Sequence, residues 1–298
     1  MDVIKIGAAI KMLRIRAGYT QKEIAECLHV TDKAVSKWER GLSLPDITLI
    51  TQLSIILNCD VDQLLEGNIS YLYRSWQGWL IMDNNGIFSG TEIYDKPLVY
   101  YFLCYFMLAG INRIYITCSE SDCRYLEHKI GNGLSFGINL KYLSQDDMIP
   151  PADRDTMVVY DNPFLYGPNL TKYFHRAMSR KNGISVLTIS EVGSPSFIMC
   201  SSNQERSVQR PEKNENRQYC VPITFFPKGY CLHLKDYRNI WNLDPLYVEP
   251  MGNGMICYPV LDSDAVLDTA CFVRYLSTRM GKMIYSPEEI AYKRGFIG

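Results

Sequence analysis

The side chains that most often do covalent or metal chemistry do not cluster in this sequence. Its four histidines have no serine, cysteine or aspartate at a local spacing that would make a nucleophile and its base. Its ten cysteines include no C-x-x-C pair and no zinc-type spacing, and stand at positions 27, 59, 104, 118, 123, 200, 220, 231, 257 and 271. We therefore expect reduced cysteines in the core, with no zinc site.

Positively charged side chains are instead concentrated near the amino terminus. Residues 1 to 45 hold eight Lys and Arg against five Asp and Glu, whereas the whole chain has a formal net charge of −1. A protein with this balance does not bind polyanions over its whole surface, so any contact with nucleic acid must come from a local cluster.

Five short helices are expected to carry that cluster within residues 1 to 68. Apolar residues recur at helical spacing up to Ala17-Gly18, and Thr20 with Glu23 then forms a capping box at the start of a second helix. After a tight turn, Thr31 caps a third helix that Gly41 ends, which makes a helix-turn-helix. The segments PDITLITQLSIIL and DVDQLLEG complete the all-α domain.

The segment TQKEIAECLHVTDKAVSKWERGLSLPD resembles the Cro/phage-repressor class of helix-turn-helix domains. The resemblance implies a homodimer on double-stranded DNA, with the third helix in the major groove. His29 stands where the family often has glycine, and histidine tolerates left-handed geometry. The positions implied to face bases are Asp32, Lys33, Ser36 and Lys37. The positions implied to contact phosphates are Gln21, Thr31 and Arg40. A helical dimerisation domain with no DNA partner is the alternative.

A short connection over residues 69 to 78 precedes a change of pattern at Trp79. From there to residue 298, helical stretches alternate with β-rich runs: WLIM, RIYITC, LKYL, TMVVYD, SVLTIS and VPITFF. Such alternation favours an α/β domain with a mixed, mostly parallel sheet. The apolar run Leu98 to Ile111 is shorter than the ~20 residues of a membrane span, so we expect a buried helix, no membrane contact and a cytoplasmic protein.

Four segments of this second domain resemble sugar-1-phosphate nucleotidyltransferases, and glucose-1-phosphate thymidylyltransferase most of all. They occur in the family's order at residues 93 to 116, 130 to 145, 158 to 170 and 270 to 297. The resemblance implies a Rossmann-like fold that joins a nucleoside triphosphate to a sugar phosphate and releases pyrophosphate. It implies Mg²⁺ as the candidate cofactor, and a nucleotide sugar or sugar phosphate as the small-molecule partner.

The phosphate-binding loop of that family is missing here. Its members carry G-G-x-G-T-R-L and S-K-x-L-L-P before the IYDKP segment, whereas this chain has no Lys or Arg between Trp79 and Asp95. A triphosphate needs cations and backbone N–H donors, and this stretch offers the carboxylates Asp83, Glu92 and Asp95. We therefore expect a degenerate nucleotidyltransferase with no catalytic residues.

Four other positions match ligand-binding positions of the family. Gln145 matches the glutamine that reads the base, and Arg210 falls near the lysine that holds the sugar phosphate. Asp161, in Tyr160-Asp161-Asn162, matches a metal carboxylate, although a turn cap explains it equally well. Asp262 matches the second metal carboxylate, with Asp264 and Asp268 left open as alternatives.

These observations favour a transcription regulator whose second domain is a nucleotide-sugar sensor or a dimerisation scaffold. One alternative is an active nucleotidyltransferase with an autoregulatory DNA-binding domain. Another is an interaction protein that binds neither DNA nor ligand.

Overall fold

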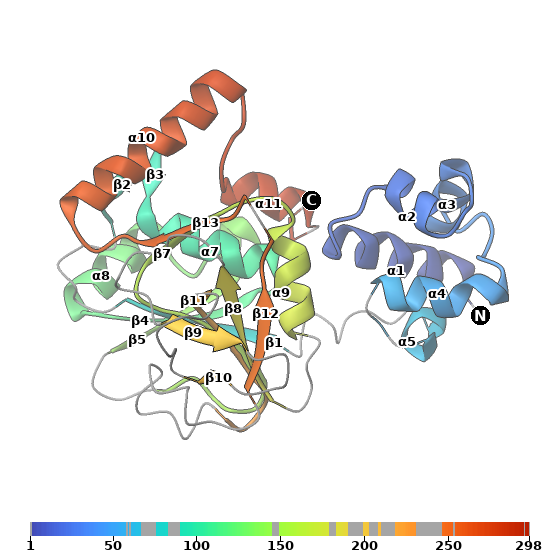
Figure 1. Cartoon of the computed structure of the whole chain (residues 1–298), viewed down its shortest axis with the longest axis horizontal. Coiled ribbons are helices and arrows are strands. Elements are labelled where there is room, and N and C mark those ends of the chain that lie inside the picture. The colour runs from blue at the N-terminus through green and yellow to red at the C-terminus, as the bar shows by residue number, and fades with distance from the viewer. Residues whose placement is uncertain are drawn as a thin grey trace. The chain divides into compact units, whose positions relative to one another are not determined.

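The computed structural model describes residues 2–57, 59, 61–66, 76–82, 90–144, 149–178, 183–189, 199–202, 208–209, 218–230, 246–252, 254–294 and 296–297. The chain divides into two compact units, Met1–Ser75 and Trp76–Gly298 (Figure 1). The first strand of the second unit begins at Trp76, so Trp76 to Gly78 belong to that strand rather than to a connection.

The first unit consists of the five expected helices: α1 Val3–Arg16, α2 Gln21–Cys27, α3 Asp32–Glu39, α4 Ile47–Leu57 and α5 Val61–Glu66 (Figure 1). They enclose one apolar core, to which each of them contributes: Ile6, Ile10, Leu13, Ile24, Val35, Trp38, Leu53 and Leu64. Where α1 crosses α3, a Cβ on Gly7 would lie 2.3 Å from the carbonyl oxygen of Trp38. Glycine at this position therefore allows the two helices to approach closely.

The predicted signals that begin and end these helices are confirmed. The Glu23 amide donates to the Thr20 hydroxyl at 3.2 Å, and the Thr20 amide donates to the Glu23 carboxylate at 2.7 Å. This donation lowers the pKa of Glu23. His29 has φ 54°, the expected left-handed geometry in the turn between α2 and α3, and Gly41 after α3 has φ 67°.

The second unit is built on a mixed sheet whose central block is parallel. That block has the order β5-β4-β1-β6 and comprises β1 Trp76–Ile81, β4 Arg113–Cys118, β5 Asn139–Ser144 and β6 Asp155–Val159. Next to β6 lies the antiparallel strand β11 Gln218–Phe226. Beyond it the sheet continues through β8 Ile184–Ile189 and β12 Leu246–Pro250, and through β9 Met199–Ser202 and β10 Val208–Gln209.

Two small antiparallel pairs lie outside this sheet. One joins β2 Glu92–Ile93 to β3 Lys96–Pro97, and the other joins β7 Pro163–Tyr166 to β13 Ile256–Pro259. The second pair matters for the candidate site, because it connects the segment after β6 to the segment that precedes the longest helix of the described chain.

The helices contribute to a large core on one face of the sheet: α7 Leu98–Leu108, α8 Glu120–Lys129, α9 Leu170–Met178, α10 Ser263–Met280 and α11 Pro287–Lys293, with the 3₁₀ turn η1 Leu134–Phe136. As expected from its composition, α7 is buried along nearly its whole length. A Cβ on Gly78 of β1 would lie 2.6 Å from the Phe106 ring, so glycine lets α7 lie against the sheet. No helix in the described ranges is both long and apolar enough to cross a bilayer.

A second apolar cluster lies on the opposite face of the sheet. Alternate residues of β1 divide between the two clusters, as side chains on a strand must. The second cluster includes Trp79, Ile81, Val158, Tyr160, Val186 and Phe226.

Candidate functional site

The predicted DNA-contacting residues lie on α3 and at its two caps, except for Gln21, which begins α2. Thr31 caps the helix by accepting a hydrogen bond from the Ala34 amide at 3.2 Å. The residues that follow the cap, Asp32 and Lys33, are exposed to solvent. Five of the predicted residues are exposed: Thr31, Asp32, Lys33, Lys37 and Arg40. Ser36 and Gln21 are half-buried. The inner side of α3 buries Val35, Trp38 and Glu39, so this helix has one packed face and one cationic face.

A buried ion pair holds α3 in place. Glu39 is buried, with 2% of its side chain exposed, and pairs with the guanidinium of Arg14 from α1. Gln21 at the start of α2 also donates to Glu39, at 2.7 Å. Gln21, which the sequence analysis assigned to a phosphate, therefore fixes the α2–α3 arrangement as well. Sequence reasoning missed the Arg14–Glu39 pair, because its partners are 25 residues apart.

The strand order of the second unit indicates where a ligand would bind. β1 and β6 are parallel neighbours, while the chain leaves β1 through α7 for β4 on the other side. In open α/β sheets, ligands bind outside the carboxyl ends of the strands at such a switch point. Asp161 lies two residues after the end of β6, and therefore at this edge.

The segment after β6 has an unusual backbone. Asp161 has φ 53° and Asn162 has φ 46°, two consecutive left-handed residues that are not glycine. Asn162 has 2% of its surface exposed, and its side-chain Oδ1 has no hydrogen-bond partner in the described part of the chain. Strained backbone and a buried polar atom without a partner are both common at ligand sites.

The β7–β13 pairing brings Asp262 toward Asp161. Pro163 lies opposite Pro259, and the Val260 amide donates to the Asn162 carbonyl at 2.9 Å. Two residues further, Asp262 is exposed and caps α10 by accepting the Ala265 amide at 2.8 Å. The alternatives Asp264 and Asp268 lie on α10 itself.

The oxygen donors of Asp161 and Asp262 are of the kind that Mg²⁺ prefers. One oxygen of the Asp262 carboxylate accepts the hydrogen bond that caps α10. Its other oxygen could face a cation. No group of three metal-ligating side chains occurs among the residues that could be placed. Two carboxylates with several waters would be a usual set for Mg²⁺.

Several predicted ligand positions fall outside the described residues. They are Gln145, Arg210 and the loop residues 83 to 89 that follow β1. The first cation after that loop, Lys96, is buried and donates to the Asp95 carboxylate at 2.9 Å and to the Ile284 carbonyl at 3.0 Å. Lys96 therefore stabilises the fold, and its ammonium is already engaged.

Tyr160, which stands where the family has glycine, is buried. Its ring belongs to the second apolar cluster together with Trp79 and Val158. The added bulk therefore extends the core beneath the edge where β1 and β6 end.

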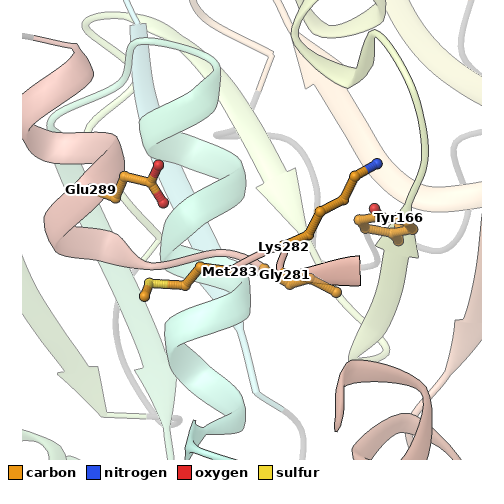
Figure 2. Close-up of a pocket in the computed structure, with 6 residues that line it drawn as sticks. Tyr166, Gly281, Lys282, Met283 and Glu289 are labelled. Atoms are coloured by element: carbon orange, nitrogen blue, oxygen red, sulfur yellow. The ribbon is translucent and has the colours of Figure 1, made fainter. Parts of the chain in front are cut away.

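The structure also contains a pocket away from those strand ends. It has a volume of about 510 Å³ and is lined by Tyr166, Gly281, Lys282, Met283, Ile284 and Glu289. Figure 2 shows the Lys282 side chain extending alongside Tyr166. Tyr166 lies at the far end of β7 from Asn162, about 13 Å away along an extended strand. We assign this pocket no part in nucleotide chemistry.

The expectation that all cysteines are reduced core residues is wrong for four of them. Cys118 at the end of β4 and Cys123 in the first turns of α8 form a disulfide, with their Cα atoms 5.9 Å apart. Cys27 and Cys271 are exposed. Burial raises the pKa of the Cys104 and Cys257 thiols, so these two are unreactive.

Comparisons with known proteins divide along the same two units. A helix-turn-helix family model matches residues 10–64. The SPbeta prophage-derived uncharacterized HTH-type transcriptional regulator YonR of Bacillus subtilis is 34% identical over 101 residues, which cover 33% of this chain and 92% of that protein.

Other relatives are enzymes. Glucose-1-phosphate thymidylyltransferases of Mycolicibacterium smegmatis and Mycobacterium tuberculosis are 28% and 29% identical over 236 and 241 residues, covering 69% of this chain and 81% of each enzyme.

Solved structures support the same fold. A glucose-1-phosphate thymidylyltransferase homologue from Bacillus anthracis has a TM-score of 0.54 at 13% identity, over 67% of this chain and 95% of that one. UTP-bound UGPase from Acinetobacter baumannii has a TM-score of 0.51 at 11% identity, over 69% and 95%. Through its amino-terminal unit the chain belongs to the Cro/phage-repressor-type helix-turn-helix family, and a glucose-1-phosphate thymidylyltransferase-like nucleotidyltransferase domain makes up the rest of it.

Proposed function

We propose that this protein is a sequence-specific DNA-binding transcription regulator. The observation that carries the proposal is the exposed face of α3, where Lys33, Lys37 and Arg40 lie outside while Glu39 is paired inside. In this family the corresponding helix enters the major groove, and dimers read half-sites about one helical turn apart. Lysines on such a face contact base edges or phosphates, and the phosphate contacts make binding depend on salt.

The residues of the α2–α3 region divide into two proposed roles. Base edges are read by Asp32, Lys33, Ser36 and Lys37. Phosphates are contacted by Gln21, Thr31 and Arg40, and these contacts set the register of the helix without specifying sequence. Arg40 donates one N–H to the Ser36 carbonyl at 3.2 Å, which directs its guanidinium along the outside of α3.

The second domain, on this proposal, no longer catalyses. The stretch from Trp79 to Asp95 has no Lys or Arg, and the next cation, Lys96, is engaged within the fold. Transfer of a nucleotidyl group needs cations around a triphosphate, and each lost stabilising contact costs roughly 10²- to 10³-fold in rate. Binding a nucleotide sugar requires less, and Asp161, Asn162 and Asp262 remain at the strand ends.

Two roles are proposed for this domain: a nucleotide-sugar sensor or a dimerisation scaffold. A sensor must bind its ligand unequally in the DNA-competent and DNA-incompetent states, because a ligand with equal affinity for both shifts neither. Isothermal titration of the full chain with dTDP-glucose, with and without Mg²⁺, separates the two roles. Saturable heat supports the sensor, and no heat at millimolar ligand leaves the scaffold.

DNA binding is tested by selection followed by titration. Genomic fragments retained by the full chain are sequenced, and the enriched site is then used in mobility-shift titrations at several salt concentrations. We expect one enriched palindromic motif and an affinity that falls steeply with salt. Retention of fragments with no common motif would overturn the regulator proposal and favour a plain interaction protein.

An active nucleotidyltransferase that also regulates its own operon is the second candidate. The observation that favours it is the β7–β13 pairing, which brings the two candidate metal carboxylates to one end of the sheet. Release of pyrophosphate from a nucleoside triphosphate and a sugar 1-phosphate, abolished by Asp161→Asn, would establish that activity. Release indistinguishable from a blank without protein would exclude it.

A further inference from the structure

The helix α10 presents an apolar stripe to solvent. Leu267, Cys271 and Tyr275 follow one another at intervals of four residues, and Leu267 and Tyr275 are 62% and 60% exposed. At about 100° per residue they share one face of the helix. The opposite face is the one that packs, through Thr269, Val273 and Leu276. In Figure 1, α10 runs along the rim of the second unit, where it contacts β2.

Charged residues of opposite sign flank this stripe in the two halves of α10. The exposed acids Asp264 and Asp268 lie in the amino-terminal half of α10, and the exposed Arg274 and Arg279 lie in its carboxyl-terminal half. None of the four forms an ion pair within the described parts of the chain. A helix with acids at one end and cations at the other is electrostatically complementary to an antiparallel copy of itself.

We propose that α10 pairs antiparallel with α10 of a second copy of this chain, with the two-fold axis passing beside Cys271. Leu267 lies four residues before Cys271, and Tyr275 lies four residues after it. Leu267 of one copy would therefore face Tyr275 of the other copy. Asp264 lies seven residues before Cys271 and Arg279 eight residues after it, so these two would lie at one level.

The arrangement fits a second copy better than another partner. A two-fold interface uses the same patch on both molecules, so residue i meets residue j and j meets i. The stripe and its charges are arranged symmetrically about Cys271, as a two-fold interface requires. A partner other than a second copy would not require that symmetry. The inference deepens the proposed dimerisation role of the second domain by assigning its interface to α10, and it holds whether or not the protein binds DNA or a nucleotide sugar.

Cysteine crosslinking tests the axis directly. Treating the full chain with a short bismaleimide should give a covalent dimer, because helix axes in contact lie about 8–10 Å apart. Cys27→Ser, which removes another exposed thiol, should leave the dimer, and Cys271→Ser should abolish it. A dimer that persists in Cys271→Ser at wild-type yield would place the interface elsewhere.

Sedimentation measures the strength of the interface. A single helix pair buries less than the roughly 1,200 Å² of a standard interface, so we expect dissociation in the micromolar range. Adding a charge to the apolar stripe with Leu267→Glu and Tyr275→Glu should weaken the dimer about tenfold or more. Tyr292→Glu, a matched change at an exposed tyrosine on α11, should leave it unchanged. If Tyr292→Glu weakened the dimer as much as the stripe variants do, that result would contradict the proposal.

A charge exchange keeps the inference testable even if the stripe variants fold poorly. Asp264→Arg should weaken the dimer by placing like charges together, and adding Arg279→Asp should restore it. Failure of the double variant to regain any affinity would overturn the antiparallel register. A dimer that depends on α10 in a protein that selects no DNA motif would support this inference and overturn the regulator proposal.

Discussion

The carboxylates of the two units lie in different electrostatic environments. In the first unit, Glu39 is buried and paired with Arg14, so the outer face of α3 keeps a surplus of cations. In the second unit, Asp161 and Asp262 lie at the end of the sheet, and the loop that should bring cations to them contains no Lys or Arg. The first surface therefore suits a polyanion, whereas we propose that the second suits a cation or sugar hydroxyls better than a triphosphate.

The two units differ in whether the residues that specify the fold also shape the candidate binding surface. The second unit keeps the strand order and the helices of a nucleotidyltransferase-like fold, because a large apolar core specifies them. On our proposal this domain lacks the phosphate-binding cations of the family, and the fold does not require them because apolar side chains specify it. In the first unit the same residues that hold the fold, Arg14, Gln21 and Glu39, also hold the cationic face in place.

Breaking the buried pair should have the largest effect. Glu39→Gln leaves the Arg14 guanidinium largely buried without a counter-charge, which costs about 3–5 kcal/mol. Hydrogen exchange of the full chain should show this loss of protection in α1, α2 and α3, while peptides of the central sheet keep theirs. Glu26→Gln, which removes an exposed carboxylate near Lys22, should change protection only slightly. Unchanged exchange in α3 would mean that the pair does not hold the helix.

Removing one cation from α3 should affect DNA binding without affecting stability. Lys37→Ala should weaken binding to the selected site by about 1–3 kcal/mol if Lys37 reads a base, and should relax preference at that base pair. If Lys37 instead contacts a phosphate, affinity should fall on all sequences and the salt slope should decrease by about one. Lys129→Ala, an exposed lysine at the end of α8, is the matched charge control. Equal mobility shifts for both variants would remove α3 from the interface.

The elements that local sequence predicted are those whose stability is local. RIYITC coincides with β4, and LVYYFLCYFML with α7, because β-branched alternation and an unbroken apolar run leave few alternatives. The capping box at Thr20 and the left-handed His29 also followed from neighbouring residues. The role of Asp262 as the second metal carboxylate stays a prediction from family resemblance.

The features that sequence could not reveal depend on contacts between distant residues. Arg14 meets Glu39 only after α1 crosses α3, and Asp262 approaches Asp161 only through the pairing of β7 with β13. The disulfide between Cys118 and Cys123 arises because α8 begins directly at the end of β4 and turns back over it. The Tyr160 ring could have filled the site or the core, and only the strand register decides for the core.

Removing single carboxylates should distinguish a metal-dependent ligand site from a structural turn. If the full chain binds dTDP-glucose with Mg²⁺, Asp161→Asn should lower affinity about tenfold, equivalent to about 1.4 kcal/mol. Asp262→Asn should do the same while keeping the helix cap, because asparagine is also a good N-cap residue. Glu127→Gln, which removes an exposed carboxylate on α8, is the control. An affinity of Asp161→Asn equal to that of wild type, with and without Mg²⁺, would assign Asp161 to the turn alone.

The capping box should give the smallest effect, and its sign is fixed by pH. The pKa of Glu23 is lowered from its ordinary value of 4.5, chiefly because the Thr20 amide donates to its carboxylate. A lowered pKa in the folded state means that the carboxylate adds stability above the unfolded pKa and loses it as pH falls through the folded value. Glu23→Gln should therefore reduce protection of α2 slightly at pH 6, and the difference from wild type should shrink as the pH falls below 4.5 and through the lowered pKa of Glu23. A difference that persists undiminished in acid would mean that the glutamate acts through packing rather than charge.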